Sequence, residues 1–418
     1  MSDPRVSVIV PIYNADPYLD ECLDSIENQT EQSLEIICVN DKSTDRTAEI
    51  LERRSQSDTR YQVFQGEGLG AGAARNLGIG ASRGTYLICL DADDFFDETF
   101  IKDAADKLDA TGADVLITQS YTYENDTHEE YLTDWTFVTG NLPDKDVFNY
   151  RDMQDSIFNT FSNVPWNKMY KRSFIVENHL WYQQVKRTDD LLFTCLALVK
   201  ARSITTIKRP YPHYRISLTT NSTSTNEVDP LAFFEAFRSL KEELEKLGLF
   251  ENVKTSYVNH AIDGYYANLT SQKTLATFVK VFESAERYFT ELELGSLKTA
   301  EYLNASQLAY INNAIAMSLD EFIFTQLQEV TAQRDLSWKT NRTNERERWK
   351  YYDAYTLLAP QIPILEEKLH NETEARKDVE GKLQRAEDEI ETILNSKAYR
   401  FGTSIATPYR KVVDALHH

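Results

Sequence analysis

Short apolar runs and amphipathic stretches alternate over residues 6–90 of the chain. Each run is long enough for one buried strand, and between the runs apolar side chains recur every three or four positions, as on one face of a helix. The runs predict strands at 6–11, 34–39, 61–64 and 85–90, and the stretches predict helices at about 17–28, 45–55 and 72–84. Ser43 or Thr44 is expected to cap the second helix. Strand–helix units in this order predict an α/β fold, a mainly parallel sheet with helices on both faces.

The pattern becomes less regular after residue 94. Residues 122–160 are polar and predict irregular structure. Further elements are predicted on either side of them: a helix at about 100–109, a strand at 114–118, a helix at 191–201 and short strands at 204–207 and 212–216. Residues 217–227 are rich in Ser, Thr and Asn, which predicts a linker or a mobile loop.

Helical periodicity dominates from residue 229 to about 350. Asp229 can cap the first of these helices, Pro230 suits its first position and Gly248 can end it. Residues 355–395 repeat apolar side chains at alternating steps of four and three, which indicates a coiled coil or an amphipathic helix that packs on its own domain. We therefore expect four parts: an α/β domain at 1–225, an all-α domain at 229–350, a coiled-coil-like helix at 355–395 and a tail at 396–418.

Composition and charge narrow the class of protein. The 418 residues suffice for two or three domains, and a formal net charge of −21 argues against a nucleic-acid partner. The four cysteines are scattered without metal-ligand spacing, which is typical of a reducing compartment. The N-terminus leads directly into a strand, and no apolar run approaches the roughly 18 residues of a membrane span. We therefore expect a cytoplasmic protein without a signal peptide or a membrane helix.

The tail at 396–418 differs from the acidic chain before it. Four Lys or Arg residues stand against a single Asp, with aromatic and aliphatic side chains between them. Such a segment can lie on an anionic bilayer surface, and copies joined by a coiled coil would bind it more strongly. These patterns predict a homo-oligomer in peripheral contact with the inner face of the cell membrane. The alternative is a tail that packs onto the helical domain.

The strand at 85–90 leads directly into three carboxylates, Asp91, Asp93 and Asp94. Buried carboxylates are costly unless a cation meets them, and α/β folds place their ligands at the carboxyl ends of parallel strands. A divalent metal that carries a phosphorylated substrate is such a cation. The alternative is a strand that ends in a solvated acidic turn.

The ends of the other strands meet at the same edge of the predicted sheet. Tyr13 and Asp41 suit a pyrimidine base, one by stacking on it and the other by accepting its imide N–H. The glycines at 66–72 start a helix and are followed by Arg75, an arrangement that suits phosphates. These side chains together predict a nucleotide site at this edge.

The glycine-rich stretch also matches a dinucleotide-binding fingerprint, G-x-G-x-x-A, with Asp91 about 20 residues further on in the place of a ribose-binding acid. Two features disfavour a dinucleotide site. The fingerprint follows the third strand instead of the first, and three carboxylates stand where such a site needs one.

Seven short motifs between residues 5 and 216 resemble, in order, those of the family 2 glycosyltransferases with the GT-A fold. They are 8–14 (VIVPIYN), 39–45 (VNDKSTD), 70–79 (GAGAARNLGI), 90–94 (LDADD), 166–170 (WNKMY), 188–193 (TDDLLF) and 212–215 (PHYR). Each motif alone is common, whereas the ordered set is specific and covers about half of the chain.

The resemblance implies roles for individual side chains. It implies donor binding by Pro11, Tyr13 and Asp41 at the base, by Arg75 near the diphosphate, and by Asp91 and Asp93 at the ribose and the metal. The family's general base corresponds to Asp190, and its usual Glu–Asp pair is here Asp189–Asp190, which leaves open which carboxylate reaches the acceptor. The alternative role for both is to cap the helix that follows.

Two further motifs carry weaker implications. The resemblance places Trp166, Asn167 and Lys168 beside the acceptor or the donor sugar, although Trp166 could equally pack in the core. It makes His213 a candidate ligand of the metal or the diphosphate, and an ordinary hydrogen-bonded histidine is the alternative.

Together, the resemblance and the strand ends predict an inverting glycosyltransferase of the hexosyl or N-acetylhexosaminyl type, assisted by Mn²⁺ or Mg²⁺. Its donor would be a nucleotide sugar, first of all a UDP-sugar. Its acceptor would be a glycan, a wall polymer or a lipid-linked sugar of a bacterial cell-surface polysaccharide or glycoconjugate. The alternative is a non-catalytic sugar-nucleotide-binding or assembly subunit, against which the intact Asp91, Asp93 and Asp190 argue.

Overall fold

A computed structural model describes residues 3–185, 187–217 and 229–340, with side chains placed as far as residue 333. The chain divides into two compact units. The first contains Met1–Gln272 and Glu283–Ala309, and the second contains Lys273–Phe282 and Tyr310–His418. The predicted coiled-coil-like helix at 355–395 and the tail at 396–418 lie outside the described residues.

A mixed ten-stranded sheet forms the centre of the first unit, with its main strands in the order β3-β2-β1-β4-β9-β6-β10-β5. The strands are β1 (Val6–Ile12), β2 (Leu34–Asn40), β3 (Tyr61–Gln65), β4 (Tyr86–Cys89), β5 (Phe95–Phe96), β6 (Val115–Glu124), β7 (Glu130–Leu132), β8 (Val147–Phe148), β9 (Lys168–Lys171) and β10 (Ile204–Ile216). The longer pairings, β1 with β2 and β4, β2 with β3, and β6 with β10, are parallel. The short strands β5, β7, β8 and β9 are added antiparallel.

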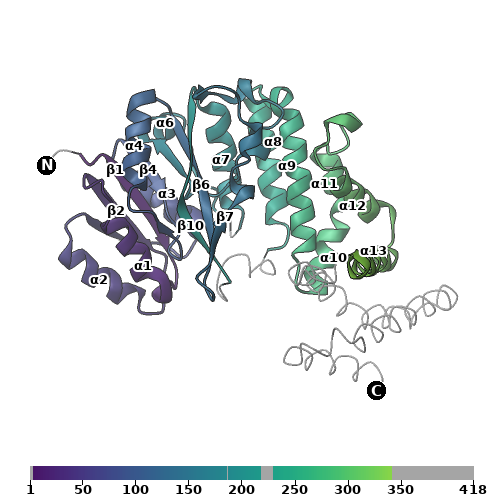
Figure 1. Ribbon diagram of the computed structural model, residues 1–418, viewed down its shortest axis with the longest axis horizontal. Helices are drawn as coiled ribbons and strands as arrows, with labels where there is room; N and C mark the ends of the chain where they lie inside the picture. The colour runs from purple at the N-terminus through teal and green to yellow at the C-terminus, as the bar shows by residue number, and fades with distance from the viewer. Residues whose placement is uncertain (1–2, 186, 218–228, 341–418) are drawn as a thin grey trace, which may run out of the picture. The chain divides into compact units, whose positions relative to one another are not determined.

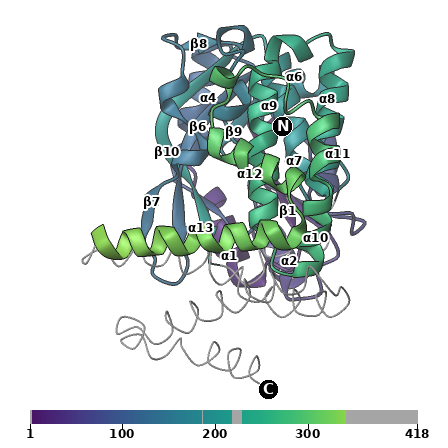
Figure 2. The ribbon, with the colours of Figure 1, turned by 90° about the vertical axis from the view of Figure 1, so that its right-hand side faces the viewer.

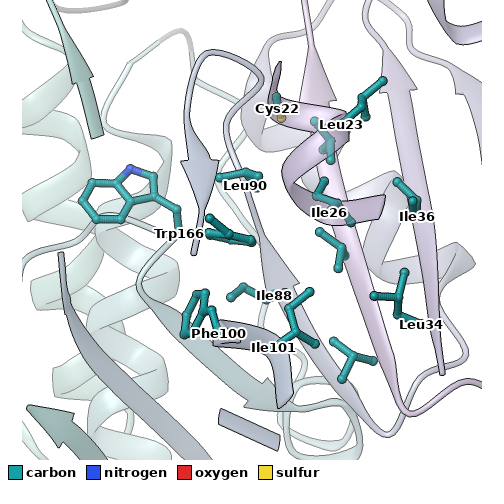
Figure 3. Close-up of a cluster of buried hydrophobic side chains, with 14 of the residues drawn as sticks. Cys22, Leu23, Ile26, Leu34, Ile36, Ile88, Leu90, Phe100, Ile101 and Trp166 are labelled. Atoms are coloured by element: carbon teal, nitrogen blue, oxygen red, sulfur yellow. The ribbon is translucent and has the colours of Figure 1, made fainter. Parts of the chain in front are cut away.

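Helices cover both faces of this sheet, as the alternation of strands and helices predicts (Figure 1). The helices of the first half are α1 (Asp16–Glu27), α2 (Thr47–Ser57), α3 (Ala71–Ala81), α4 (Phe100–Thr111), α5 (Ile157–Thr160), α6 (Arg172–Glu177) and α7 (Asp189–Lys200). On one face, Leu23 of α1 and Ile101 of α4 share a buried cluster with Ile88 of β4 (Figure 3). On the other face α3 lies so close that a side chain at Gly78 would meet Ile9. The α/β prediction is confirmed.

Two local predictions for this region are wrong. The two short strands expected at 204–207 and 212–216 form one strand, β10, whose pairing with β6 is irregular on both sides of Pro210. A proline has no N–H to donate, so it interrupts the ladder without ending the strand. The expected cap of α2 is also misplaced: Ser43 accepts a hydrogen bond from Asn14 N–H at 3.0 Å, and Asp45 Oδ1 accepts one from Thr47 N–H at 3.1 Å.

Three helices of the second half, α8 (Ala232–Lys246), α9 (Phe250–Thr270) and α11 (Ala285–Glu291), belong to the same compact unit as the sheet. The α8 helix packs on α7 and α9 packs on α5. The Phe158 N–H of α5, for example, donates to Ser256 Oγ of α9 at 2.8 Å. Judged by these contacts, the compact unit that contains the sheet continues past 225–229, where the boundary between the α/β domain and the all-α domain was expected. The α8 helix begins two positions after Pro230, and Gly248, at φ 67°, follows its end.

The second unit contains most of α10 (Leu275–Glu283) and α12 (Ala305–Ala316), and all of α13 (Leu319–Thr340). Aromatic side chains hold these helices together: the Phe322 ring lies 5.1 Å from Phe282 and 5.0 Å from Tyr310 between centroids. Figure 2 shows α13 as a single long helix. The region that follows the sheet is thus all-helical, as predicted. Among the described residues, no helix has the length and apolar character needed to span a bilayer.

Candidate active site

The carboxyl ends of β1, β2 and β4 meet at one edge of the sheet, because these strands are parallel and adjacent. The last pair of β1 and β2 joins Ile12 to Asn40, so the residues that follow them lie side by side. Tyr13 follows β1 and is 65% exposed, which leaves its ring free to stack on a base. Pro11 is buried within β1.

Asp41, which follows β2, holds the glycine-rich turn in place. Its Oδ1 accepts the Gly68 N–H at 2.7 Å and its Oδ2 accepts the Gly70 N–H at 2.8 Å. Gly70 has φ 96°, a conformation that side chains disfavour. Because each carboxylate oxygen has a further lone pair, Asp41 can shape this turn and still accept an N–H from a base.

Arg75 links the end of β4 to the start of α7. Its guanidinium donates from Nη2 to Asp91 Oδ1 at 2.6 Å and from Nη1 to Asp189 Oδ2 at 2.7 Å. It also lies 5.2 Å from the centre of the Tyr182 ring. The side chain of Arg75 is buried, and its Nε has no hydrogen-bond partner. Two motifs that lie nearly one hundred residues apart are therefore joined by one buried cation.

A glycine permits this approach of α3 to α7. A side chain at Gly72 would meet the backbone oxygen of Gln183 at 2.4 Å and Asp189 Oδ2 at 3.0 Å. The first turn of α7 can therefore lie against α3 only where position 72 has no Cβ. The same approach brings Asp189 within reach of Arg75.

Arg75→Met is expected to destabilise the fold by roughly 2–3 kcal/mol, because it leaves two partly buried carboxylates without their cation. Urea unfolding followed by circular dichroism measures this change. The control is Arg238→Met, which removes an exposed ion pair with Glu235 and should change stability by less than about 1 kcal/mol. An unchanged unfolding midpoint for Arg75→Met would mean that solvent already screens Asp91 and Asp189.

Asp190 follows Asp189 in the first turn of α7 and is half-buried. Burial, followed by the charge of Asp189, raises the pKa of Asp190 to about 7, although Arg75 and Lys168 act in the opposite direction. The start of a helix by itself favours the ionised form of a carboxyl, but here the loss of solvation outweighs the helix dipole. A carboxyl that titrates near neutral pH is suited to accept a proton from a hydroxyl.

The three carboxylates after β4 have different surroundings. Asp91 is paired with Arg75, and Asp93 is partly exposed, with a pKa that burial and then Asp91 raise to about 6. Asp94 is only 2% exposed and accepts the Arg215 N–H at Oδ1, at 2.8 Å. The alternative of a solvated acidic turn therefore does not hold for Asp94, whose carboxylate is buried against the backbone of β10.

Arg215 is a site residue to which the sequence analysis gave no role. Its side chain is buried, and its Nε donates to the backbone oxygen of Asp93 at 2.8 Å. The guanidinium also lies over the rings of Tyr18 and Tyr123. Arg215 thereby holds the Asp93 backbone from the far end of β10. Its only signal in the sequence was its place in the last family motif.

His213 lies beside this region but is engaged with other side chains. Its Nδ1 lies 2.8 Å from Glu130 Oε1, and its ring stacks on Phe95 at 4.4 Å between centroids. Within the described ranges, no group of three or more His, Cys, Asp or Glu residues is arranged to hold a metal ion. A role of His213 with Asp93 at a metal stays a prediction.

Trp166, Asn167 and Lys168 are placed in the interior. Trp166 is 1% exposed and stacks on Tyr214 at 5.5 Å, as its alternative role in the core predicts. Lys168 Nζ donates to the backbone oxygens of Ser162 and Val164 and to Asn167 Oδ1, at 2.7–2.8 Å. Burial lowers the pKa of Lys168 to about 7. These side chains support the site from within, and contact with a sugar stays a prediction.

The chain is similar in sequence to known glycosyltransferases. Residues 7–177 match the family model "Glycosyl transferase family 2". The chain is 32% identical to the putative glycosyltransferase EpsH of Bacillus subtilis over 232 residues, 52% of this chain and 62% of EpsH. It is 25% identical to the poly(ribitol-phosphate) β-N-acetylglucosaminyltransferase TarS of Staphylococcus aureus over 269 residues, 63% of this chain and 44% of TarS. The chain thus spans less than two thirds of the length of these relatives.

A solved structure shares the fold. The crystal structure of S. aureus TarS 1–349 in complex with UDP-GlcNAc superimposes with a TM-score of 0.59 at 21% identity, over 75% of this chain and 87% of that one. The likeness shows a GT-A-like arrangement of the sheet and its helices. Residues 7–177 thus form a domain that matches the glycosyltransferase family 2 model.

Proposed function

We propose that this chain is an inverting glycosyltransferase that moves a sugar from a UDP-sugar to a hydroxyl of a glycan or polymer acceptor. The observation that carries the proposal is the link from Asp91 through Arg75 to Asp189, which joins the candidate donor carboxylates to the helix turn that bears Asp190. A donor site and a base are thereby held together. The UDP-GlcNAc complex of TarS supports the choice of donor.

The reaction requires three tasks of the protein. Tyr13 and Asp41 would hold the base, and the exposed ring and the carboxylate suit this task. Asp190 would accept the proton of the acceptor hydroxyl as its oxygen attacks the anomeric carbon, from the side opposite the departing diphosphate. Such a base contributes roughly 10²–10⁴ in rate. Attack from the opposite side inverts the configuration at that carbon.

The carboxylates after β4 fit a divalent cation. Burial and the nearby Asp91 raise the pKa of Asp93, so a cation bound by these two residues would relieve a real electrostatic cost. One or two carboxylates together with substrate phosphates are the usual ligands of Mg²⁺. When bound, the ion supplies Lewis-acid stabilisation of the charge that builds on the diphosphate.

Release of free nucleoside diphosphate tests the proposed function. The protein is incubated with UDP-glucose, UDP-galactose, UDP-GlcNAc, UDP-GalNAc or GDP-mannose and Mn²⁺, and free UDP or GDP is measured. We expect UDP from at least one UDP-sugar and none above background with Asp93→Ala. Release from GDP-mannose alone would contradict the choice of donor. No release from any donor would favour the non-catalytic alternative.

We further propose that the segment at 355–395 joins copies of the chain into an oligomer. This proposal rests on the heptad spacing of the segment alone. A protein that ends after residue 350 is expected to be a monomer that still hydrolyses donor, whereas the full chain is expected to be an oligomer. Light scattering measures both masses. Equal mass per chain in the two proteins would mean that this segment does not join copies.

A further inference from the structure

The segment at 121–140 is the most one-sidedly charged part of the candidate site. It contains five carboxylates, Glu124, Asp126, Glu129, Glu130 and Asp134, and neither Lys nor Arg. From the sequence alone, irregular structure is expected at 122–160. In the structure it supplies the end of β6, the edge strand β7 and the turn at Asp134–Thr136.

Several large apolar side chains of this acidic segment are exposed to solvent. Trp135 is 56% exposed and Tyr131 is 44% exposed, with Leu132 beside them at 42%. An exposed tryptophan gives up much of the hydrophobic stabilisation that burial would provide, and exposed aromatic rings in a polar setting commonly mark a binding site.

The turn that carries Trp135 is anchored to the sheet on both sides. The hydroxyl of Thr136 bonds Ser120 at 2.7 Å, and that of Thr133 bonds Thr122 at 2.8 Å, so both sides of the turn are tied to β6. All four of these side chains are buried. A rigid platform binds a ligand with less loss of conformational entropy than a flexible one.

The platform is continuous with the candidate donor site. The Trp135 ring meets the Tyr214 ring edge to face, at 6.1 Å between centroids and 85° between planes. Tyr214 directly precedes Arg215, whose backbone N–H donates to Asp94 Oδ1 and whose Nε donates to the backbone oxygen of Asp93, both at 2.8 Å. A second link is the contact between Glu130 of β7 and His213.

We propose that Trp135 is the platform of an acceptor subsite that stacks an uncharged sugar ring of a glycan. The apolar C–H face of a pyranose suits an exposed indole, and its hydroxyls can reach the surrounding carboxylates. A polyanionic acceptor, such as a phosphodiester wall polymer, would be repelled by five carboxylates without a counter-charge in this segment. The proposal rests on the proposed function, since it names the acceptor class of the same site.

Direct binding of oligosaccharides without any donor tests this subsite independently of transfer. Cellotetraose and chitotetraose are the uncharged probes, and a poly(ribitol phosphate) oligomer is the anionic one, each titrated by calorimetry at low salt. We expect Trp135→Ala to weaken binding of at least one uncharged probe about tenfold, whereas Trp135→Phe, which keeps a flat ring, should weaken it by less than about threefold. Wild-type protein should bind the anionic probe at least about tenfold more weakly.

Each other outcome counts against the subsite. Equal binding by wild type and Trp135→Ala, or absence of binding of both uncharged probes, would refute the platform. Stronger binding of poly(ribitol phosphate) would refute the acceptor class. Leu303→Ala, which removes a side chain that is 61% exposed outside this segment, is the matched control and should bind as wild type. Failure of the proposed function is seen separately, as the lack of UDP release from every donor.

Discussion

Asp190→Asn is expected to lower the transfer rate by roughly 10²-fold or more, because the amide keeps the shape of the carboxylate but cannot accept the acceptor's proton. Donor affinity should stay close to that of the wild type, since Asp190 is not among the candidate donor-binding residues. Calorimetric titration with UDP measures the affinity, and steady-state kinetics measures the rate. A loss of affinity equal to the loss of rate would contradict the assignment of a base.

The neighbouring carboxylate is the matched control. In Asp189→Asn the carboxylate that pairs with Arg75 is replaced, so we expect a smaller loss of rate together with lower stability. If Asp189→Asn shows the larger loss of rate, the base is Asp189.

The pH dependence gives a second test of the base. The pKa of Asp190 is raised to about 7, so the group is protonated and inactive below that pH, and the rate should rise as pH increases through it. A rate that stays constant from about pH 5 to 8 would mean that the base titrates at its ordinary, lower pKa.

Most of the sheet could be predicted because each of its strands is determined by a short local stretch of sequence. Three of the four strands before residue 91, β1, β2 and β4, are buried at every position, and a strand that is buried on both faces has few other interpretations. The predicted strand bounds differ from β1, β2, β3 and β4 by one or two residues. Parallel order then follows from the helices between them, which places the strand ends at one edge.

The contacts across the site could not be predicted, because they join residues that are distant along the chain. Arg75 was expected at a diphosphate, yet its charge is paired with Asp91 and Asp189. Nothing near Arg75 in the sequence indicates a partner on a helix more than one hundred residues later. The role of Arg215 was missed for the same reason, since its contact with the Asp93 backbone exists only in three dimensions.

The burial of individual side chains could not be predicted from the motifs either. Trp166, Asn167 and Lys168 belong to a family motif. The residues of such a motif can support a binding site from the protein interior without contacting the ligand. Lysine side chains are rarely fully buried, so the residue type alone argues against an interior position for Lys168. Three oxygen acceptors around its Nζ make that burial possible.

Asp93→Ala is expected to lower turnover by roughly 10²–10³-fold or more, because it would remove a proposed ligand of a divalent cation that stabilises charge on the departing diphosphate. The fold should keep its stability. Burial and the charge of Asp91 raise the pKa of Asp93 to about 6, so its ionised form is disfavoured. Replacing Asp93 therefore also removes its charge repulsion with Asp91. Thermal unfolding tests this part of the prediction.

Metal-dependent binding of UDP separates this role from a purely structural one. Wild-type protein should bind UDP more tightly with Mn²⁺ than with EDTA, and Asp93→Ala should bind it equally in both. Asp97→Ala, four residues further along, removes a carboxylate that pairs with the exposed Arg209 and should behave as wild type. Full wild-type activity in excess EDTA would remove the metal from the mechanism. The charge on the diphosphate would then have to be met by protein groups alone, and Arg75, which has an unused donor at Nε, would be the first candidate.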